Sequence, residues 1–328
     1  MKAWVVRELG GPDSMRLEDV DPGEPHDGFV RVAVRGAAIN FPDVLMIAGL
    51  YQVKPELPFV PGVEVSGEVL SAPASSGFNA GDHVMALLDS GGLTRGGYAE
   101  IADAAPQSVV RMPDEMSFED GAGFTLIYQT GWFGLHRRAK LQPGETLLVH
   151  AGAGGVGSAA VQLGKAAGAT VIATAGSDEK VAVCLKLGAD HALNYKTQDF
   201  VEEVKKLTDG RGADVIYDPV GGEVYDRSTK CIAFEGRIVL VGFTSGHIPQ
   251  AATNHILVKN YSVLGLHWGL YARRAHELIP PATHSLLDLY RSGKIKPHIS
   301  ARLPLTEAPQ ALAMVAGGKS TGKVVLRP

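Results

Sequence analysis

The amino-acid sequence predicts an α/β protein of two domains, in which a doubly wound parallel sheet is combined with a second, mostly antiparallel β domain. The first observation is length, because 328 residues suffice for two domains of about 150 residues each. The second is composition, since 45% hydrophobic and only 20% charged residues can fill sizeable cores. The third is rhythm: after about residue 120, short β-favouring segments alternate with helical ones, which is typical of βαβ units with right-handed crossovers.

The chain up to about Pro113 has the pattern of an antiparallel β domain. Short strand-like segments follow one another there, and glycine and proline turns separate them. The expected strands are 2–7, 29–38, 65–70 and 84–88, and the turns lie at 10–12, 21–23, 61–62 and 81–82.

A second region begins around Ser117, where the pattern changes to helix and then to regular alternation. We expect the domain boundary near residue 120 and strands at 146–150, 170–174, 190–193, 213–217, 236–241 and 262–265. A longer helical segment is expected from Gly269 to Arg291. The final elements, at 299–303, 306–316 and 323–326, do not fit this rhythm, so we expect them to return to the N-terminal domain.

A glycine-rich turn marks the start of the parallel sheet. The apolar run Leu147–Val149 leads into G-x-G-x-x-G at Gly152, Gly154 and Gly157, and a helical apolar period follows to Ala167. The first glycine is expected to supply a turn with positive φ, the second to let backbone approach a pyrophosphate, and the third to let the helix pack closely.

Such a motif alone can be a plain turn, but here it follows a strand and opens a helix, as a dinucleotide site requires. The free N–H groups and positive dipole end of the helix favour an anion. The turn, including Gly155 and Val156, is therefore our candidate cofactor site.

The tip of the second strand indicates which nucleotide is bound. Enzymes that use NAD hold the ribose hydroxyls there with an Asp or Glu, yet this strand ends at Ala175-Gly176 without a carboxylate. Ser177 and Lys180 follow, and a hydroxyl with an ammonium suits a 2′-phosphate. The plain alternative is an N-cap serine and a solvated lysine.

Tyr195, after the third strand, could add a hydroxyl to this site or be an ordinary residue at a strand end. Asp178 and Glu179 speak against a phosphate, although their positions beyond the tip favour a solvent-facing placement. NADPH is accordingly the expected cofactor.

Charge and hydropathy exclude several classes of partner. A net charge of −4 without long runs of like charge gives no support for nucleic-acid binding. The uncharged stretch 146–164 contains five glycines, which argues against a membrane span. The two cysteines provide neither a disulfide framework nor a thiolate zinc site. With no secretory signal apparent, we expect a cytoplasmic protein.

Several ordered motifs resemble the zinc-independent medium-chain dehydrogenase/reductases, in particular their NADPH:quinone oxidoreductase (zeta-crystallin-like) branch. The resemblance covers nearly the whole chain and rests on the segments 37–40 (AAIN), 61–67 (PGVEVSG), 81–84 (GDHV), 96–100 (GGYAE), 150–157, 187–190 (LGAD) and 322–326 (GKVVL).

The resemblance implies a GroES-like catalytic and substrate domain formed by 1–120 and 266–328, a Rossmann NADP-binding domain at 121–265, and a substrate cleft between them. Family members are commonly homodimers or homotetramers. Zinc-containing relatives have a cysteine at the position of Asn40 and a histidine at that of Val63, so a metal is not expected here; Glu64 alone is no metal site.

By the same resemblance, Asn40 and Tyr51 would lie at the nicotinamide end as catalytic residues. Each has a plainer alternative, since Asn40 could cap backbone groups and Tyr51 could pack a loop. The residues that would line the cofactor, besides Asn40 and the glycine turn, are Thr130, Ser177, Lys180, Tyr195, Phe243, Leu266 and Lys323.

The sequence therefore leads us to expect an NADPH-dependent, zinc-free reductase of a small conjugated acceptor, either a quinone or an α,β-unsaturated carbonyl, acting as a homo-oligomer. One alternative is an enoyl-thioester reductase, for which Arg273 and Arg274 could attract the phosphates of an acyl-CoA. Another is a low-turnover NADPH-binding or RNA-binding protein, which the negative charge disfavours.

Overall fold

The computed structural model describes all residues from 1 to 328 and divides the chain into two compact units. Unit 1 consists of Met1–Leu126 together with Pro297–Pro328, and unit 2 of Ile127–Lys296. The C-terminal segment thus joins the N-terminal one, because its strand β15 (Lys323–Arg327) pairs with β3 (Val30–Ala38).

Unit 1 is built on a largely antiparallel β-sheet. Its strand order is β14-β15-β3-β4-β5-β7, and β6 also pairs with β3; only β14 and β15 run parallel. A separate hairpin is formed by β1 (Lys2–Val6) and β2 (Met15–Asp19). The remaining strands are β4 (Glu64–Ser71), β5 (His83–Leu87), β6 (Ile101–Ala104), β7 (Val109–Arg111) and β14 (Ile299–Pro304).

Three short helices accompany this sheet: α1 (Phe41–Ile47), α2 (Phe118–Ala122) and α11 (Ala308–Ala316). Ser117 caps α2, its hydroxyl accepting from the Asp120 N–H. One apolar core joins both ends of the chain, since Val32 and Val65 share a cluster with Leu312 and Leu326. Burying that surface gives the discontinuous unit its cohesion.

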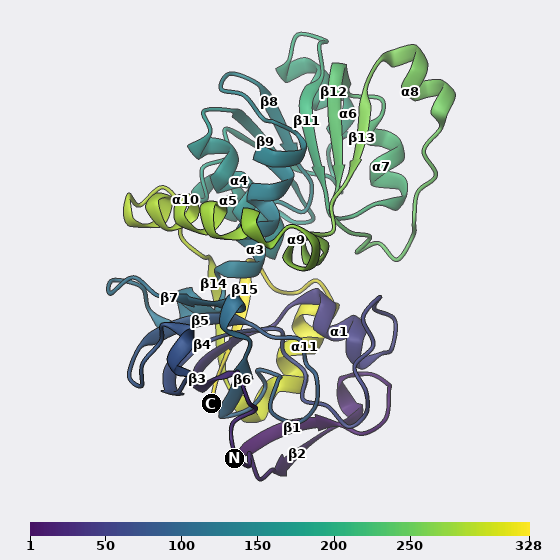
Figure 1. Cartoon of the computed structure of the whole chain (residues 1–328). Coiled ribbons are helices and arrows are strands. Elements are labelled where there is room, and N and C mark those ends of the chain that lie inside the picture. The colour runs from purple at the N-terminus through teal and green to yellow at the C-terminus, as the bar shows by residue number, and fades with distance from the viewer. The chain divides into compact units, whose positions relative to one another are not determined.

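Unit 2 carries the expected doubly wound sheet, in which all six strands are parallel (Figure 1). The order is β10-β9-β8-β11-β12-β13: the chain moves outward from β8 to β10 and then returns to β11 on the other side of β8. The topological switch point therefore lies between β8 and β11, and ligands of such sheets bind at the carboxyl ends of those strands.

The strands of unit 2 lie close to the expected ranges. They are β8 (Thr146–Val149), β9 (Thr170–Ala175), β10 (His191–Asn194), β11 (Ala213–Asp218), β12 (Ile232–Leu240) and β13 (Ser262–Gly265). The helices among them are α4 (Gly155–Ala166), α5 (Asp178–Lys186), α6 (Phe200–Leu207), α7 (Gly222–Ser228) and α8 (Thr253–Lys259).

The segment 266–296 differs from the expectation in two ways. It belongs to unit 2, so the structural boundary follows Lys296 instead of residue 265. Hydrogen bonds explain this placement: the Gln129 amide donates to Thr283, and the Lys296 N–H donates to Gln162.

The expected single helix from 269 to 291 is also interrupted. The structure has α9 (Trp268–Arg274), a 3-10 turn and then α10 (Ile279–Arg291), with Ala275 in a non-helical conformation between them. Two prolines occupy the first turn of α10, where their missing N–H groups cost little, but neither could continue a helix from α9.

Helix α3 (Thr125–Trp132) leads directly into a π-helical segment, Phe133–Arg138. Gly131 packs against Leu163 of α4, and Gly134 packs against Tyr217 of β11. A side chain at either position would press on these neighbours, so the two glycines allow this helix to lie close to α4 and the sheet.

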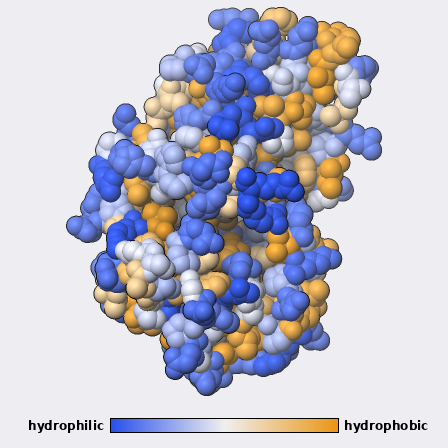
Figure 2. Space-filling model, viewed as in Figure 1, coloured by the Kyte–Doolittle hydropathy of each residue, from blue (hydrophilic) through white to orange (hydrophobic).

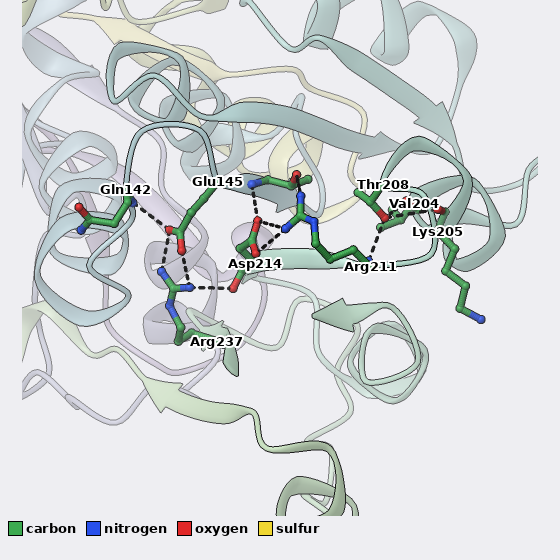
Figure 3. Close-up of polar contacts among 10 residues, drawn as sticks. Gln142, Glu145, Val204, Lys205, Thr208, Arg211, Asp214 and Arg237 are labelled. Atoms are coloured by element: carbon green, nitrogen blue, oxygen red, sulfur yellow. Dashed lines mark hydrogen bonds and ion pairs between the residues drawn. The ribbon is translucent and has the colours of Figure 1, made fainter. Parts of the chain in front are cut away.

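An ion-pair network, which we call the sheet-end network, closes the amino ends of β8 and β11 (Figure 3). Arg237 binds both carboxylate oxygens of Glu145 at 2.8 Å, and Arg211 binds both oxygens of Asp214 at 2.7 Å. The Thr146 N–H and the Arg237 guanidinium tie Asp214 to the neighbouring strands. This network lies at the opposite end of the sheet from the glycine turn.

Hydrophobic side chains form small groups among hydrophilic ones on the face shown in Figure 2, and one such group lies at α8. Leu257 and Val258 on α8 are each about three-quarters exposed, as is Phe234 of β12. No helix combines the length and the hydropathy that a membrane span requires.

Candidate cofactor site and buried polar cluster

The glycine turn in unit 2 has the strand-turn-helix form that the sequence predicts. Strand β8 ends at Val149, the turn follows, and α4 begins at Gly155 with Gly154 as its N-cap. A Cβ on Gly157 would lie 2.1 Å from the carbonyl oxygen of Ala151, so only glycine lets the helix approach the turn this closely.

The role expected of Gly152 needs correction. Positive φ in this turn belongs to Ala151, at +50°, whereas Gly152 is not among the residues of positive φ. Gly152 is instead required by close packing, because a Cβ there would lie 2.8 Å from that of Ala173 and 3.0 Å from the sulfur of Cys184. A left-handed conformation at a residue with a Cβ is unfavourable, so the surrounding turn must hold Ala151 in it.

The first turn of α4 provides an anion-binding position. Within the helix, the first intrahelical bond runs from the Ser158 N–H to the Gly154 carbonyl, which leaves the preceding N–H groups of Gly155, Val156 and Gly157 outside the helical pattern. No side chain caps them. Together with the helix dipole they favour a phosphate at the switch point.

Ser177 and Lys180 lie at the tip of β9, as expected. The Ser177 side chain caps α5 by accepting from the Lys180 N–H at 3.4 Å, so the plainer N-cap role is present in the structure. Tyr195 lies directly over this tip, since a Cβ on Gly176 would be 2.6 Å from its hydroxyl oxygen. The Ser177 side chain, the Tyr195 hydroxyl and the Lys180 backbone N–H thus lie at the same strand tip.

The two neighbouring carboxylates differ from one another. Asp178 is held by the Asn194 amide at 2.8 Å, which fixes its carboxylate toward β10. Glu179 is fully exposed, and a hydrogen bond from the Ser177 hydroxyl lowers the pKa of its carboxyl. Glu179 therefore competes for the hydroxyl that a 2′-phosphate would use.

The other expected cofactor residues of unit 2 lie in separate elements. Phe243 follows β12 and covers the turn after β11, where a Cβ on Gly221 would lie 2.7 Å from its ring. Leu266 follows β13 and is bound through its N–H to the Leu240 carbonyl. Thr130 is buried in α3.

Two polar residues near the carboxyl ends of the strands of unit 2, Asp218 and His150, were not predicted as site residues from the sequence. Asp218, the last residue of β11, is fully buried and accepts from the N–H groups of Val220 and Gly221, which shapes the turn under Phe243. Burial raises the pKa of its carboxyl. In the sequence, the signal for this turn was an aspartate at the end of a strand, followed shortly by the glycine pair Gly221-Gly222.

His150 connects the glycine turn to its surroundings. Its ring nitrogens contact the hydroxyls of Thr174 at 3.0 Å and Ser228 at 2.8 Å. Complete burial lowers the pKa of His150 to about 3, so the ring is neutral at physiological pH. It therefore links β8, β9 and α7 without adding charge beside the turn.

A second polar group, which we call the buried cluster, lies inside unit 1. Asn40, Glu64 and Lys323 meet there although they are far apart in the sequence. Asn40 is the N-cap of α1, while Glu64 and Lys323 begin β4 and β15, which both pair with β3. The Lys323 ammonium donates to Asn40 Oδ1 at 2.5 Å and to Glu64 Oε2 at 3.1 Å.

Asp43 and Tyr98 complete the buried cluster. Asp43 accepts from the Asn40 N–H and from the Tyr98 hydroxyl, each at 2.8 Å, and from the Val63 N–H at 3.2 Å. Burial raises the pKa of Asp43 to about 6, although these donors oppose the shift. Burial beside Asp43 also raises the pKa of the Tyr98 hydroxyl.

The buried cluster does not fit a divalent metal. Asn40 Oδ1 and Glu64 Oε2 already accept from an ammonium, and Val63 offers no ligand atom. The chain has no group of three His, Cys, Asp or Glu side chains that could hold a metal ion. Tyr51, the other residue expected in this region, is half-buried in the loop after α1.

Comparison with known proteins agrees with this architecture. Residues 26–114 match the family model described as the alcohol dehydrogenase GroES-like domain, and residues 155–282 match the one described as zinc-binding dehydrogenase. A quinone oxidoreductase-like protein 2 homolog from Nematostella vectensis is 39% identical over 99% of this chain and 88% of its own length. The chain belongs to the quinone oxidoreductase-like medium-chain dehydrogenase/reductases.

Further members of this family extend the comparison. The crystal structure of an Escherichia coli quinone oxidoreductase complexed with NADPH superposes with a TM-score of 0.91, at 29% identity and over all of both chains. A 2-haloacrylate reductase from Burkholderia is 31% identical over 99% of this chain and 98% of its own length. The GroES-like domain and the Rossmann sheet expected from the resemblance are thus confirmed.

Proposed function

We propose that this oxidoreductase uses NADPH to reduce a small conjugated acceptor, a quinone or an α,β-unsaturated carbonyl, without a metal. The observation that carries the proposal is the glycine turn at the switch point of unit 2, with Ser177 and Lys180 at the tip of β9 in place of a carboxylate. The NADPH complex of the Escherichia coli relative supports the choice of cofactor.

The residues present fit this cofactor. Gly157 lets the first turn of α4 lie close to the backbone of the glycine turn, and the uncapped N–H groups of that helix turn suit a pyrophosphate. Ser177, Lys180 and Tyr195 would hold the 2′-phosphate, while Thr130, Phe243 and Leu266 would line the rest of the nucleotide. When bound, the cofactor supplies the hydride.

The protein would contribute position and the exclusion of water. In unit 1, Asn40 and Lys323 are proposed to serve the nicotinamide end, and the Tyr51 hydroxyl is proposed to give the proton that accompanies reduction. A conjugated acceptor is favoured because the charge that develops on it is delocalised. The similarity to a 2-haloacrylate reductase, named for an activated alkene, supports this class of acceptor.

The test is NADPH oxidation by the purified protein with a small quinone, an enone and an enoyl-CoA, each followed by the loss of NADPH absorbance. We expect turnover with the quinone or the enone. Preference for the enoyl-CoA would instead support the enoyl-thioester alternative, for which the exposed Arg273 and Arg274 of α9 offer positive charge. No oxidation with any acceptor would contradict the proposal.

We also propose that the chain forms homo-oligomers. Strand β13 is the last of its sheet and hydrogen-bonds only to β12. Unit 2 also exposes apolar side chains on β12 and α8, namely Phe234, Leu257 and Val258. A second copy of the chain would cover both features. Sedimentation of the purified protein tests this, and a monomer at micromolar concentration would contradict it.

A further inference from the structure

Three polar side chains are buried together behind the glycine turn of unit 2. His150, Thr174 and Ser228 are each at most 2% exposed, and the His150 ring contacts the two hydroxyls at 3.0 and 2.8 Å. Apolar side chains could fill such a place without the cost of burying polar groups. A polar network in which every group is satisfied is instead suited to fixing one arrangement of the chain.

The contacts of Ser228 assign the hydrogens of this network. The Ser228 hydroxyl has one hydrogen, which it donates to the Val224 carbonyl at 2.7 Å, so its oxygen must accept from His150 Nε2. The neutral ring has only this one N–H, and His150 Nδ1 therefore accepts from the Thr174 hydroxyl. The imidazole is thus held in one tautomer and one orientation.

The network also holds the main chain on both sides of Ala151. The His150 N–H donates to the Tyr217 carbonyl at 3.1 Å, and the Gly152 N–H donates to the Thr174 carbonyl at 2.9 Å. Thr174 therefore binds the His150 ring through its hydroxyl and Gly152 through its carbonyl. Ala151, whose φ is +50°, lies between these two anchored residues. Such a conformation persists only where the surroundings impose it.

The conformation of Ala151 in turn affects the start of α4. The Ala151 carbonyl accepts from the Gly154 N–H at 2.8 Å, and a Cβ on Gly157 would lie 2.1 Å from the same oxygen. A change of φ at Ala151 would turn this carbonyl and break its bond to Gly154, the N-cap of α4. The uncapped N–H groups of the helix would then no longer be held in place beside the turn.

We propose that His150 is a positioning residue, whose two ring hydrogen bonds keep Ala151 left-handed and the glycine turn in the conformation that binds a pyrophosphate. The inference rests on the proposed function, because the turn is the pyrophosphate site there. His150 acts from behind the turn and touches no part of the cofactor. NADPH and NADH share the pyrophosphate, so the loss of His150 should weaken both by the same factor.

The experiment combines H150L, which removes both ring hydrogen bonds, with A151G, which removes the preference against a left-handed residue. Affinity falls with the fraction of molecules whose turn is in the binding conformation. We expect H150L to raise the dissociation constants of NADPH and NADH about tenfold each, measured by quenching of protein fluorescence. In the A151G background the same substitution should raise them less than about threefold, because glycine adopts this conformation readily.

Two further variants separate positioning from a general loss of stability. T208V removes another buried hydroxyl of unit 2, which donates to the Val204 carbonyl and accepts from the Gly212 N–H, and should leave both dissociation constants unchanged. T174V keeps the side-chain shape and removes only the bond to His150 Nδ1, so it provides the same test at about threefold if H150L does not fold.

Several outcomes of the binding experiment would overturn the inference. They are unchanged affinity in H150L or T174V, an equal loss with and without A151G, and a similar loss in T208V. A loss confined to NADPH would also overturn it, because the effect would then lie at the tip of β9 instead of the turn.

A measurement without cofactor keeps this inference distinct from the proposed function. In the cofactor-free protein, the Gly152 N–H should exchange with solvent about tenfold faster in H150L than in the wild type, and at the wild-type rate in T208V. That result without NADPH oxidation would contradict the proposed function alone. Equal exchange in H150L and the wild type would contradict the positioning itself, whatever the activity.

Discussion

The buried cluster of unit 1 and the sheet-end network of unit 2 are both groups of charged side chains, but they differ in their access to water. Arg237 and Glu145 retain 19% and 22% exposure, whereas Lys323 and Glu64 retain 2% and none. Solvent stabilises each ion of the sheet-end network individually. In the buried cluster each ion depends on the other, so the loss of one partner leaves an uncompensated buried charge.

The position of each group in its fold agrees with this difference. The sheet-end network joins loops at the amino ends of β8 and β11, away from the glycine turn, where it secures strands. The buried cluster holds Asn40, a candidate site residue. Proximity of opposite charges therefore says little about function, whereas an ion pair that is buried without a gain in stability is better evidence of a functional role.

The largest expected effect comes from breaking each pair singly. K323M leaves Glu64 buried and unpaired, so we expect a loss of about 3–5 kcal/mol in the free energy of unfolding. R237M leaves Glu145 in contact with water, and a loss of about 1 kcal/mol is expected. Denaturant unfolding of both variants checks the difference, and equal losses would break the comparison.

A smaller effect is expected from pH, because Asp43 titrates within the buried cluster. The pKa of Asp43 is about 6 in the folded state, which exceeds its value in the unfolded chain. The protonated carboxyl therefore contributes to folding stability fully below about pH 4, and this contribution is lost as pH rises through about 6. Relative to D43N, the wild type should lose about 2 kcal/mol between pH 4 and pH 7.

Tyr98 provides the control for this pH dependence. Its hydroxyl donates to Asp43 and favours the ionised carboxylate, so Y98F should move the midpoint of the loss to higher pH. A pH profile of stability that is identical in the wild type and D43N would show that Asp43 does not titrate in this range.

The smallest expected effect is that of salt. At about 1 M ionic strength the Debye length falls to about 3 Å, which screens partly exposed pairs but hardly affects buried ones. The cost of R237M should therefore shrink by about half at high salt, while that of K323M should stay constant. Salt-dependent unfolding measures both, and a cost of K323M that falls with salt would indicate water access to Lys323.

Local patterns in the sequence were sufficient to predict the parallel sheet and the glycine turn. Six strands of unit 2 and the helix after Gly154 follow from periodicity and glycine spacing, which act over short distances along the chain. The interrupted helix near Ala275 and the boundary after Lys296 could not be predicted in this way, because side-chain contacts with distant helices decide them.

The buried cluster is tertiary in origin. Lys323 and Glu64 are 259 residues apart and meet only because β15 and β4 both flank β3. The resemblance pointed to Asn40 and Lys323 one at a time, but no motif linked them to Asp43 and Tyr98. Similarly, the positive φ in the turn belongs to Ala151 and not to a glycine, which glycine spacing alone does not reveal.

The relative affinity for NADPH and NADH is the sharpest test of whether the glycine turn and the β9 tip of unit 2 form an NADPH site. The measurement is the dissociation constant of NADPH and of NADH for the wild type and for K180M, by quenching of protein fluorescence. We predict that the wild type binds NADPH at least tenfold more tightly than NADH and that K180M loses most of this preference. Equal affinity of the wild type for the two cofactors would contradict the account.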